Sequence, residues 1–153
     1  MSFQFLYNTM KNLIIVGNSA TANIIKGYLS NDPRYNIICA VVDEQYTNTG
    51  IDLGIKCVGL TEIQKYYNPT DNYVLMAVGY GNLNKTRQSL FERLKSLGYT
   101  IVTYIHPNAR TYTHHPIGEG SVILPGAIIE PNAKIGTNTM IWCNTTIAHD
   151  SVV

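Results

Sequence analysis

A repeat of six residues runs through the last third of the chain and constrains its fold more than any other feature. An aliphatic residue recurs at every sixth position from 117 to 153, and a small residue follows each of the first six after four positions. The aliphatic residues are Ile117, Ile123, Ile129, Ile135, Ile141, Ile147 and Val153, and the small ones are Ser121, Ala127, Ala133, Thr139, Thr145 and Ser151. This period predicts a parallel β-helix, in which each six-residue segment forms one face of a triangular coil. A β-sandwich would instead show alternation with period two, broken by irregular loops.

The repeat extends to residues before 117, but less regularly. Ile105 with Ala109 fits the same phase, whereas Thr111 with His115 fits poorly. Since three segments make a coil, residues 105–153 supply fewer than three coils, and no amphipathic helix or charged segment follows Val153 to cover the last one. Stacked coils need several repeats and a cap. We therefore expect the chain to be a fragment, or a shortened product, of something longer, whose open last coil promotes association or fraying.

The first two thirds of the chain predict a parallel α/β sheet. Short apolar runs predict buried strands over residues 12–17, 35–42, 55–58, 72–78 and 100–105. Helices are expected after the first strand up to Leu29, from Thr61 as N-cap to Tyr67, and over 82–97 with Gly98 as C-cap. Strands that are apolar on both faces belong to parallel sheets covered by helices. The expected fold is thus a Rossmann-like α/β domain over residues 10–104, followed by a partial β-helix over 105–153.

Three segments that follow predicted strands are candidates for ligand binding, because ligands of such sheets bind beyond the carboxyl ends of the strands. They are Gly17-Asn18-Ser19, Asp43-Glu44 and Gly79-Tyr80-Gly81. Gly17 permits a sharp turn that offers helix N–H groups to a phosphate, and Asp43 can accept a hydrogen bond from a ribose hydroxyl. The loop lacks the second and third glycines of a dinucleotide site, which favours a nucleotide-linked sugar over NAD or FAD. The alternative, that Gly17 only makes a turn and Asp43 caps a loop, stays open.

Composition excludes several other classes of function. The chain carries 11 Lys and Arg against 10 Asp and Glu, so nucleic acid and anionic membrane surfaces are not expected partners. No apolar run approaches the roughly 20 residues of a membrane span, and no secretory signal is present, which predicts a cytoplasmic protein. The three cysteines are odd in number and widely spaced, which favours reduced thiols. His106 and the adjacent His114 and His115 are expected to be structural, and no metal site is predicted.

Together these features resemble the bacterial sugar acyltransferases of the sialic acid O-acetyltransferase and bacillosamine-pathway N-acetyltransferase family. The resemblance rests on the glycine loop after the first strand, the Asp after the second, the IHPNA segment at 105–109 and the repeats ending in IAHD at 147–150. It begins at Met10, which implies that residues 1–9 are an upstream extension. The resemblance implies a Rossmann-like domain that binds a nucleotide-activated sugar, and a left-handed β-helix that forms homotrimers. It also implies acetyl-CoA as acyl donor, bound along later coils between subunits.

The resemblance also implies roles for individual residues. His149 corresponds to the general base, and Asp150 to the acidic residue that orients its imidazole. Residues that match the sugar-nucleotide site are Gly17, Asn18, Ser19, Asp43, Gly79, Tyr80 and Arg87. Ala20 and Thr21 replace a glycine and a histidine of the family loop, and Trp142 stands where amino-sugar acetyltransferases have an asparagine. These departures leave open whether the acceptor is an amine or a hydroxyl, and a purely structural role for Arg87 stays equally open.

The function expected from the sequence is transfer of an acyl group, acetyl by preference, to a nucleotide-linked or surface-polysaccharide sugar. One rival is a truncated, inactive nucleotide-sugar-binding domain. Another is an NAD-linked oxidoreductase, which the missing glycines disfavour. In that family acetyl-CoA lies along later coils, most of which are absent here. If 153 residues is the whole gene product, little or no transfer activity is expected.

Overall fold

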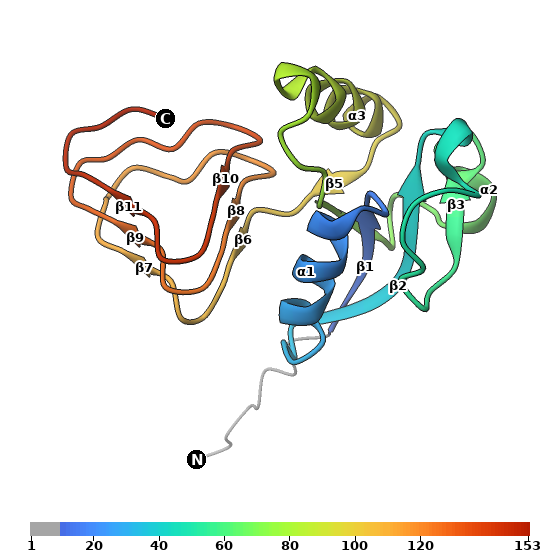
Figure 1. Ribbon diagram of the computed structural model, residues 1–153, viewed down its shortest axis with the longest axis horizontal. Coiled ribbons are helices and arrows are strands. Elements are labelled where there is room, and N and C mark those ends of the chain that lie inside the picture. Colours follow the sequence, from blue (N-terminus) through green and yellow to red (C-terminus); the bar gives the residue numbers. More distant parts are fainter. Residues whose placement is uncertain (1–9) are drawn as a thin grey trace, which may run out of the picture.

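A computed structural model describes residues 10–153, which form a five-stranded parallel sheet with its helices and, beside it, a three-sided β-helix (Figure 1). The prediction that residues 1–9 are an upstream extension lies outside the described residues. Both predicted architectures are confirmed, including the order in which they follow one another along the chain.

The parallel sheet has the strand order β3-β2-β1-β4-β5. Its strands are β1 (Lys11–Val16), β2 (Tyr35–Val42), β3 (Cys57–Gly59), β4 (Tyr73–Met76) and β5 (Thr100–Ile101). The connections contain α1 (Ala20–Leu29), α2 (Ile63–Tyr66) and α3 (Lys85–Ser96), with short 3-10 turns η1 (Glu44–Tyr46) and η2 (Asn82–Asn84). The C-cap of α3 is Leu97, one residue before the predicted Gly98, and Gly98 follows it with a φ of +87°.

Alternate residues of β1 pack on opposite faces of the sheet. Leu13 and Ile15 are buried with residues of α1, whereas Ile14 and Val16 are buried with residues of α2 and α3. Burial on both faces is why this strand is an unbroken apolar run. The α1 side also includes Tyr104, Val122 and Leu124 from the β-helix, so the two parts of the molecule share one core.

The β-helix has two three-stranded parallel sheets, β10-β8-β6 and β11-β9-β7. The strands are β6 (Tyr104–Ile105), β7 (Arg110–Thr111), β8 (Val122–Ile123), β9 (Ile128–Ile129), β10 (Met140–Ile141) and β11 (Thr146–Ile147). Ile105 pairs with Ile123 and Ile123 with Ile141, which makes a coil of three six-residue segments. The repeated isoleucines from Ile117 to Ile147 point inward and form a separate core with Ala127 and Ala133, as the period predicts, whereas Val153 is exposed.

The sequence prediction was wrong at the junction between the two parts and in the first coil. Residues 100–105 form two strands: β5 closes the first sheet, and β6 already pairs with β8 of the β-helix. Thr111 fits the repeat although its side chain is exposed. On either side of it, the N–H groups of Arg110 and Tyr112 donate to the carbonyls of Ala127 and Ile129, so the backbone here stacks on the next coil. The division between residues 104 and 105 stays a prediction.

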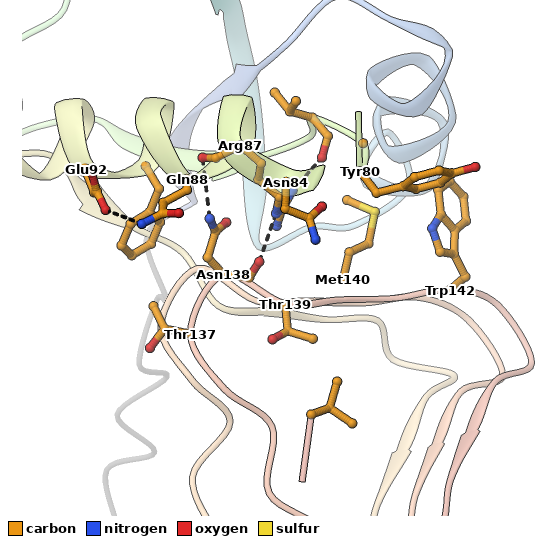
Figure 2. A pocket seen from close by; sticks show the side chains of 14 residues that line it. Tyr80, Asn84, Arg87, Gln88, Glu92, Thr137, Asn138, Thr139, Met140 and Trp142 are labelled. Atoms are coloured by element: carbon orange, nitrogen blue, oxygen red, sulfur yellow. Dashed lines mark hydrogen bonds between the residues drawn. The ribbon is translucent and has the colours of Figure 1, made fainter. Parts of the chain in front are cut away.

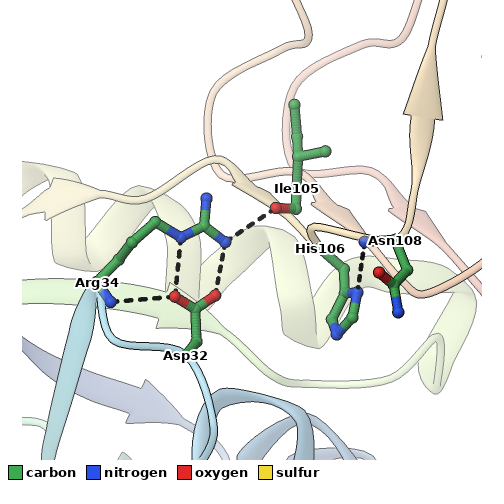
Figure 3. Close-up of polar contacts among 5 residues, drawn as sticks. All are labelled: Asp32, Arg34, Ile105, His106 and Asn108. Atoms are coloured by element: carbon green, nitrogen blue, oxygen red, sulfur yellow. Dashed lines mark hydrogen bonds and ion pairs between the residues drawn. The ribbon is translucent and has the colours of Figure 1, made fainter.

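A bidentate ion pair anchors one end of the junction between the two parts (Figure 3). Arg34 donates from Nε and Nη2 to the two carboxylate oxygens of Asp32, at 2.9 and 2.6 Å, and from Nη2 to the carbonyl of Ile105 at 3.1 Å. His106 lies beside this contact, and its Nδ1 accepts the N–H of Asn108 at 3.0 Å. These contacts agree with the structural role expected for His106.

Candidate functional site

The carboxyl ends of β1, β2 and β4 meet at a cavity of about 220 Å³. Gly17, Asn18, Ser19 and Asp43 line it, together with Tyr46, Val78, Thr86 and Leu90. The structure therefore brings two of the three predicted ligand-binding segments to one place. The third, with Gly79 and Tyr80, lines a larger cleft next to it, and Val78 borders both.

Glycine is required at position 17. Its φ is +118°, and a Cβ there would lie 3.2 Å from the carbonyl oxygen of Ala77 and 3.3 Å from Cγ2 of Val78. The sharp turn leads into α1, whose N-cap Ser19 makes no side-chain hydrogen bond to the helix and whose first turn has no acidic residue. The N–H groups at this end of α1 are thus available to an anion such as a phosphate.

Asn18 and Asp43 make protein contacts of their own. Asn18 donates from Nδ2 to the carbonyls of Tyr46 and Thr49, at 2.9 and 2.5 Å, and so fixes the loop that follows η1. Asp43 forms an ion pair with Arg93 of α3. These contacts show structural roles for both side chains, and their predicted roles toward a substrate stay predictions.

The larger cleft, of about 720 Å³, separates α3 and the loop before it from the β-helix (Figure 2). Tyr80, 78% exposed, lies at one end near Met140 and Trp142. Amide, carboxylate and hydroxyl groups line the remainder, among them Asn84, Gln88, Glu92, Thr137 and Thr139. Aromatic rings beside convergent polar groups are suited to a ligand with both an apolar face and hydroxyl or amide groups.

A left-handed turn lies between Tyr80 and α3 beside this cleft. Asn82, Leu83 and Asn84 have φ of 54°, 51° and 63°, so α3 begins at Lys85 and not at residue 82 as predicted. Three successive non-glycine residues in this region are strained, and such strain gathers at functional sites. Leu83 is a good helix former, which favoured the predicted helix, although the asparagines on either side of it tolerate a left-handed backbone better than most residues do.

Arg87 lies in the wall of the cleft but is only 3% exposed. Its Nη1 donates to the carbonyls of Met76 and Val78 at 3.2 and 2.7 Å. From the β-helix, the carbonyl of Asn138 accepts from Nε at 2.9 Å, and that of Gly120 from Nη2 at 3.4 Å. Burial lowers the pKa of Arg87 to about 10. These contacts favour the structural alternative, and a role toward substrate stays a prediction.

His149 and Asp150 form a hydrogen-bonded pair at a corner of the β-helix after β11. His149 Nδ1 lies 2.8 Å from Asp150 Oδ2, and both side chains are largely exposed. Because a carboxylate only accepts, the neutral imidazole carries its proton on Nδ1 and leaves Nε2 free as a base. The hydrogen bond that Asp150 accepts from His149, with the charge of its carboxylate, raises the pKa of His149. Hydrogen bonds from His149 and Asn132 lower the pKa of Asp150.

The His149–Asp150 pair lies outside both cavities of its own chain. Neither His149 nor Asp150 lines either of them. The strand β11 lies on the side of the β-helix away from the five-stranded sheet (Figure 1). The predicted base and the predicted sugar site are therefore on separate parts of the surface.

Across residues 10–153, no three His, Cys, Asp or Glu side chains gather in a way that could hold a metal ion. Cys39, Cys57 and Cys143 are free thiols. No helix in the same range is long and apolar enough to cross a membrane.

Comparison with protein families gives two matches along the chain. The PglD N-terminal domain matches residues 12–94, which is more than half of the chain. The chain belongs to the PglD N-terminal domain family. The bacterial transferase hexapeptide (six repeats) matches residues 117–149, within the repeat inferred from the sequence. The predicted resemblance to bacterial sugar acyltransferases is thereby confirmed.

Solved structures share the fold of this PglD-type chain. The acetyltransferase domain of PglB from Neisseria gonorrhoeae, in complex with acetyl coenzyme A, is 21% identical with a TM-score of 0.77, covering 94% of this chain and 67% of that one. PerB from Caulobacter crescentus, in complex with CoA and GDP-perosamine, is 21% identical with a TM-score of 0.73, covering 94% and 66%. WeeI from Acinetobacter baumannii is also 21% identical, with a TM-score of 0.75 and the same coverage. A search of curated proteins found no match.

Proposed function

We propose that this chain transfers an acetyl group from acetyl-CoA to an amine or hydroxyl of a nucleotide-linked sugar, with His149 as general base. The observation that carries the proposal is the His149–Asp150 pair, with Nε2 free, on a hexapeptide β-helix joined to a PglD-type domain. The complexes of similar folds with acetyl coenzyme A and with GDP-perosamine support the choice of donor and acceptor classes. We also propose that the reaction takes place in the cytoplasm.

The chemistry follows from the imidazole. Nε2 of neutral His149 takes the proton of the sugar's amine or hydroxyl while that nitrogen or oxygen attacks the thioester carbonyl carbon. The carbon–sulfur bond then breaks, and the imidazolium returns the proton to the departing CoA sulfur. Asp150 holds the ring through Nδ1 and stabilises the imidazolium, as the raised pKa of His149 reflects. Asp150 is accordingly a positioning residue.

The nucleotide-linked sugar is proposed to span the two neighbouring cavities. The turn at Gly17 and Ser19 would bind phosphate at the start of α1, and Asp43 would accept from a ribose hydroxyl. The larger cleft, beginning at Gly79, would take the sugar against Tyr80 and Trp142, since sugar rings present apolar faces to aromatic side chains. Arg87 is buried, so we assign it to the wall of this site.

A complete site requires more than one copy of the chain. Since His149 comes shortly after β11, and β11 lies on the side of the β-helix away from the five-stranded sheet (Figure 1), we propose a homotrimer in which His149 faces the sugar held by a neighbour. The rival function, a nucleotide-sugar-binding domain without transfer activity, is favoured by the same separation if the chain stays monomeric.

Isothermal titration with UDP-, GDP- and dTDP-linked amino sugars, and separately with acetyl-CoA, tests both proposals when combined with light scattering. We expect sugar-nucleotide binding that Tyr80→Ala weakens about tenfold, as for a stacked aromatic contact. Tyr66→Ala is the matched control, because Tyr66 is an exposed tyrosine on α2, outside both cavities. Binding of both ligands by a trimer supports transfer, whereas sugar-nucleotide binding alone by a monomer supports the rival. Binding of neither ligand contradicts both.

A further inference from the structure

The corner that carries His149 rests on the corner of the preceding coil. Glu130, directly after β9, donates its N–H to the carbonyl of Ile147 at 3.0 Å, and Asp150 donates its N–H to the carbonyl of Pro131 at 3.3 Å. These two bonds continue the stacking of coils from β9 and β11 into the turn. Stacked coils make backbone hydrogen bonds of this kind in general, so these two are not specific to His149.

One further contact does not belong to the stacking pattern. The carboxylate of Glu130 turns up to the next coil, where its Oε2 accepts the backbone N–H of His149 at 2.8 Å. A side-chain acceptor at this point fixes the backbone of His149 from below, while Asp150 fixes its ring from the side. Charge-assisted hydrogen bonds of this type are among the stronger ones.

Glu130 also brings a second negative charge to the imidazole. Glu130 and Asp150 are the two charged groups that raise the pKa of His149, with the larger effect from Asp150. Asn132, two residues after Glu130, lowers the pKa of the Asp150 carboxylate, and the carbonyl of Pro131 beside it accepts the N–H of Asp150. The preceding coil thus contacts both members of the pair.

We propose that Glu130 is a positioning residue for His149, holding its backbone through the N–H and stabilising its imidazolium through the carboxylate charge. The inference rests on the proposed function, since it matters for catalysis only if His149 is the base. It assigns Glu130 two separable effects, one due to a hydrogen-bond acceptor and one due to charge.

Two substitutions separate these effects. Glu130→Gln keeps an acceptor and removes the charge, whereas Glu130→Ala removes both. Glu119→Gln is the matched control: it removes a carboxylate on another corner of the same β-helix, where Glu119 pairs with Lys95 at 2.7 Å. Circular dichroism confirms that each variant is folded before comparison.

The direct measurement is an NMR titration of His149, assigned among the four histidines with a His149→Gln variant. We expect Glu130→Gln and Glu130→Ala to titrate at lower pH than the wild type and Glu119→Gln to titrate with it. In acetyl transfer, we expect the acid limb of the pH–rate profile to move the same way in Glu130→Gln with its plateau within about twofold of wild type, because the acceptor remains. Glu130→Ala should also lower the plateau kcat about tenfold, since a displaced base loses alignment.

Either of two results would overturn the inference. One is a His149 titration in Glu130→Gln that coincides with wild type, and the other is a full plateau in Glu130→Ala. Failure of the proposed function looks different: the wild type then transfers no acetyl group, while the NMR titration still decides whether Glu130 acts on the imidazole.

Discussion

Arg87 should be worth several kcal/mol to the folded state, because it joins the two parts of the molecule from a buried position. Its guanidinium donates to four backbone carbonyls, two in the α/β part and two in the β-helix. Hydrogen bonds from a charged donor contribute about 1.5 kcal/mol or more each. Against this, burial lowers the pKa of Arg87 to about 10. At roughly 1.4 kcal/mol per pKa unit, that corresponds to about 3 kcal/mol against the charged form.

The expected net effect of Arg87→Met is therefore a loss of about 3 kcal/mol, and the four carbonyls would be left without their donor. Urea unfolding followed by circular dichroism should show the midpoint lowered by about 1.5 M, for a slope near 2 kcal/mol/M. Lys85→Met is the matched control, since it removes an exposed cation from the same helix and should change stability by less than about 0.5 kcal/mol. Equal midpoints for the two variants would refute the role assigned to Arg87.

Three further predictions concern stability. Gly118→Ala should destabilise by about 3 kcal/mol or more in the same assay, because its Cβ would lie 2.2 Å from the carbonyl carbon of Gly136 in the next coil. The control is Gly27→Ala on α1, where a Cβ would meet no neighbouring atom within 4 Å and the change should be neutral or stabilising. Similar losses for both variants would contradict this packing. Leu83→Gly should stabilise by about 0.5–1 kcal/mol in thermal unfolding, since it relieves a left-handed backbone at an 88% exposed residue; a loss would mean that the side chain has a structural partner. Hydrogen bonds from Arg34 lower the pKa of Asp32 below its ordinary 3.8, so the pair stabilises the fold fully above that value and less as pH falls through the lowered pKa; Asp32→Asn should flatten the loss of stability below about pH 4, and unchanged acid unfolding would show that the pair contributes nothing.

The repeat predicted the β-helix because its inward positions obey a strict rule of size and polarity. Ile123, Ile129 and Ile141 fill the interior of the coils as their spacing requires. A second periodic signal marks the corners of the coils. Residues with positive φ recur at every sixth position through the corners, as Gly120, Gly126, Asn132, Asn138, Asn144 and Asp150. Glycine and asparagine tolerate this backbone best, so their spacing also marks the corners.

Contacts between the two parts could not be predicted in the same way. The role of Arg87 depends on where Asn138 and Gly120 lie after docking, which no local pattern encodes. Likewise, residues 100–105 are uniformly suited to a strand, and only the competition between two sheets divides them. The contact between Glu130 and His149 could have been predicted from the repeat, since Glu130 precedes His149 by 19 residues, which is one coil and one further position.

Transfer of an acetyl group from acetyl-CoA to a nucleotide-linked amino sugar, followed by mass spectrometry of the sugar, tests the proposed function most directly. Wild-type protein and His149→Ala should be compared under conditions where calorimetry shows that both bind the sugar nucleotide. We predict an acetylated sugar from the wild type and none above background from His149→Ala. Equal amounts of acetylated sugar from both proteins, or none from a wild-type trimer that binds both ligands, would contradict His149 as the base of an acetyltransferase.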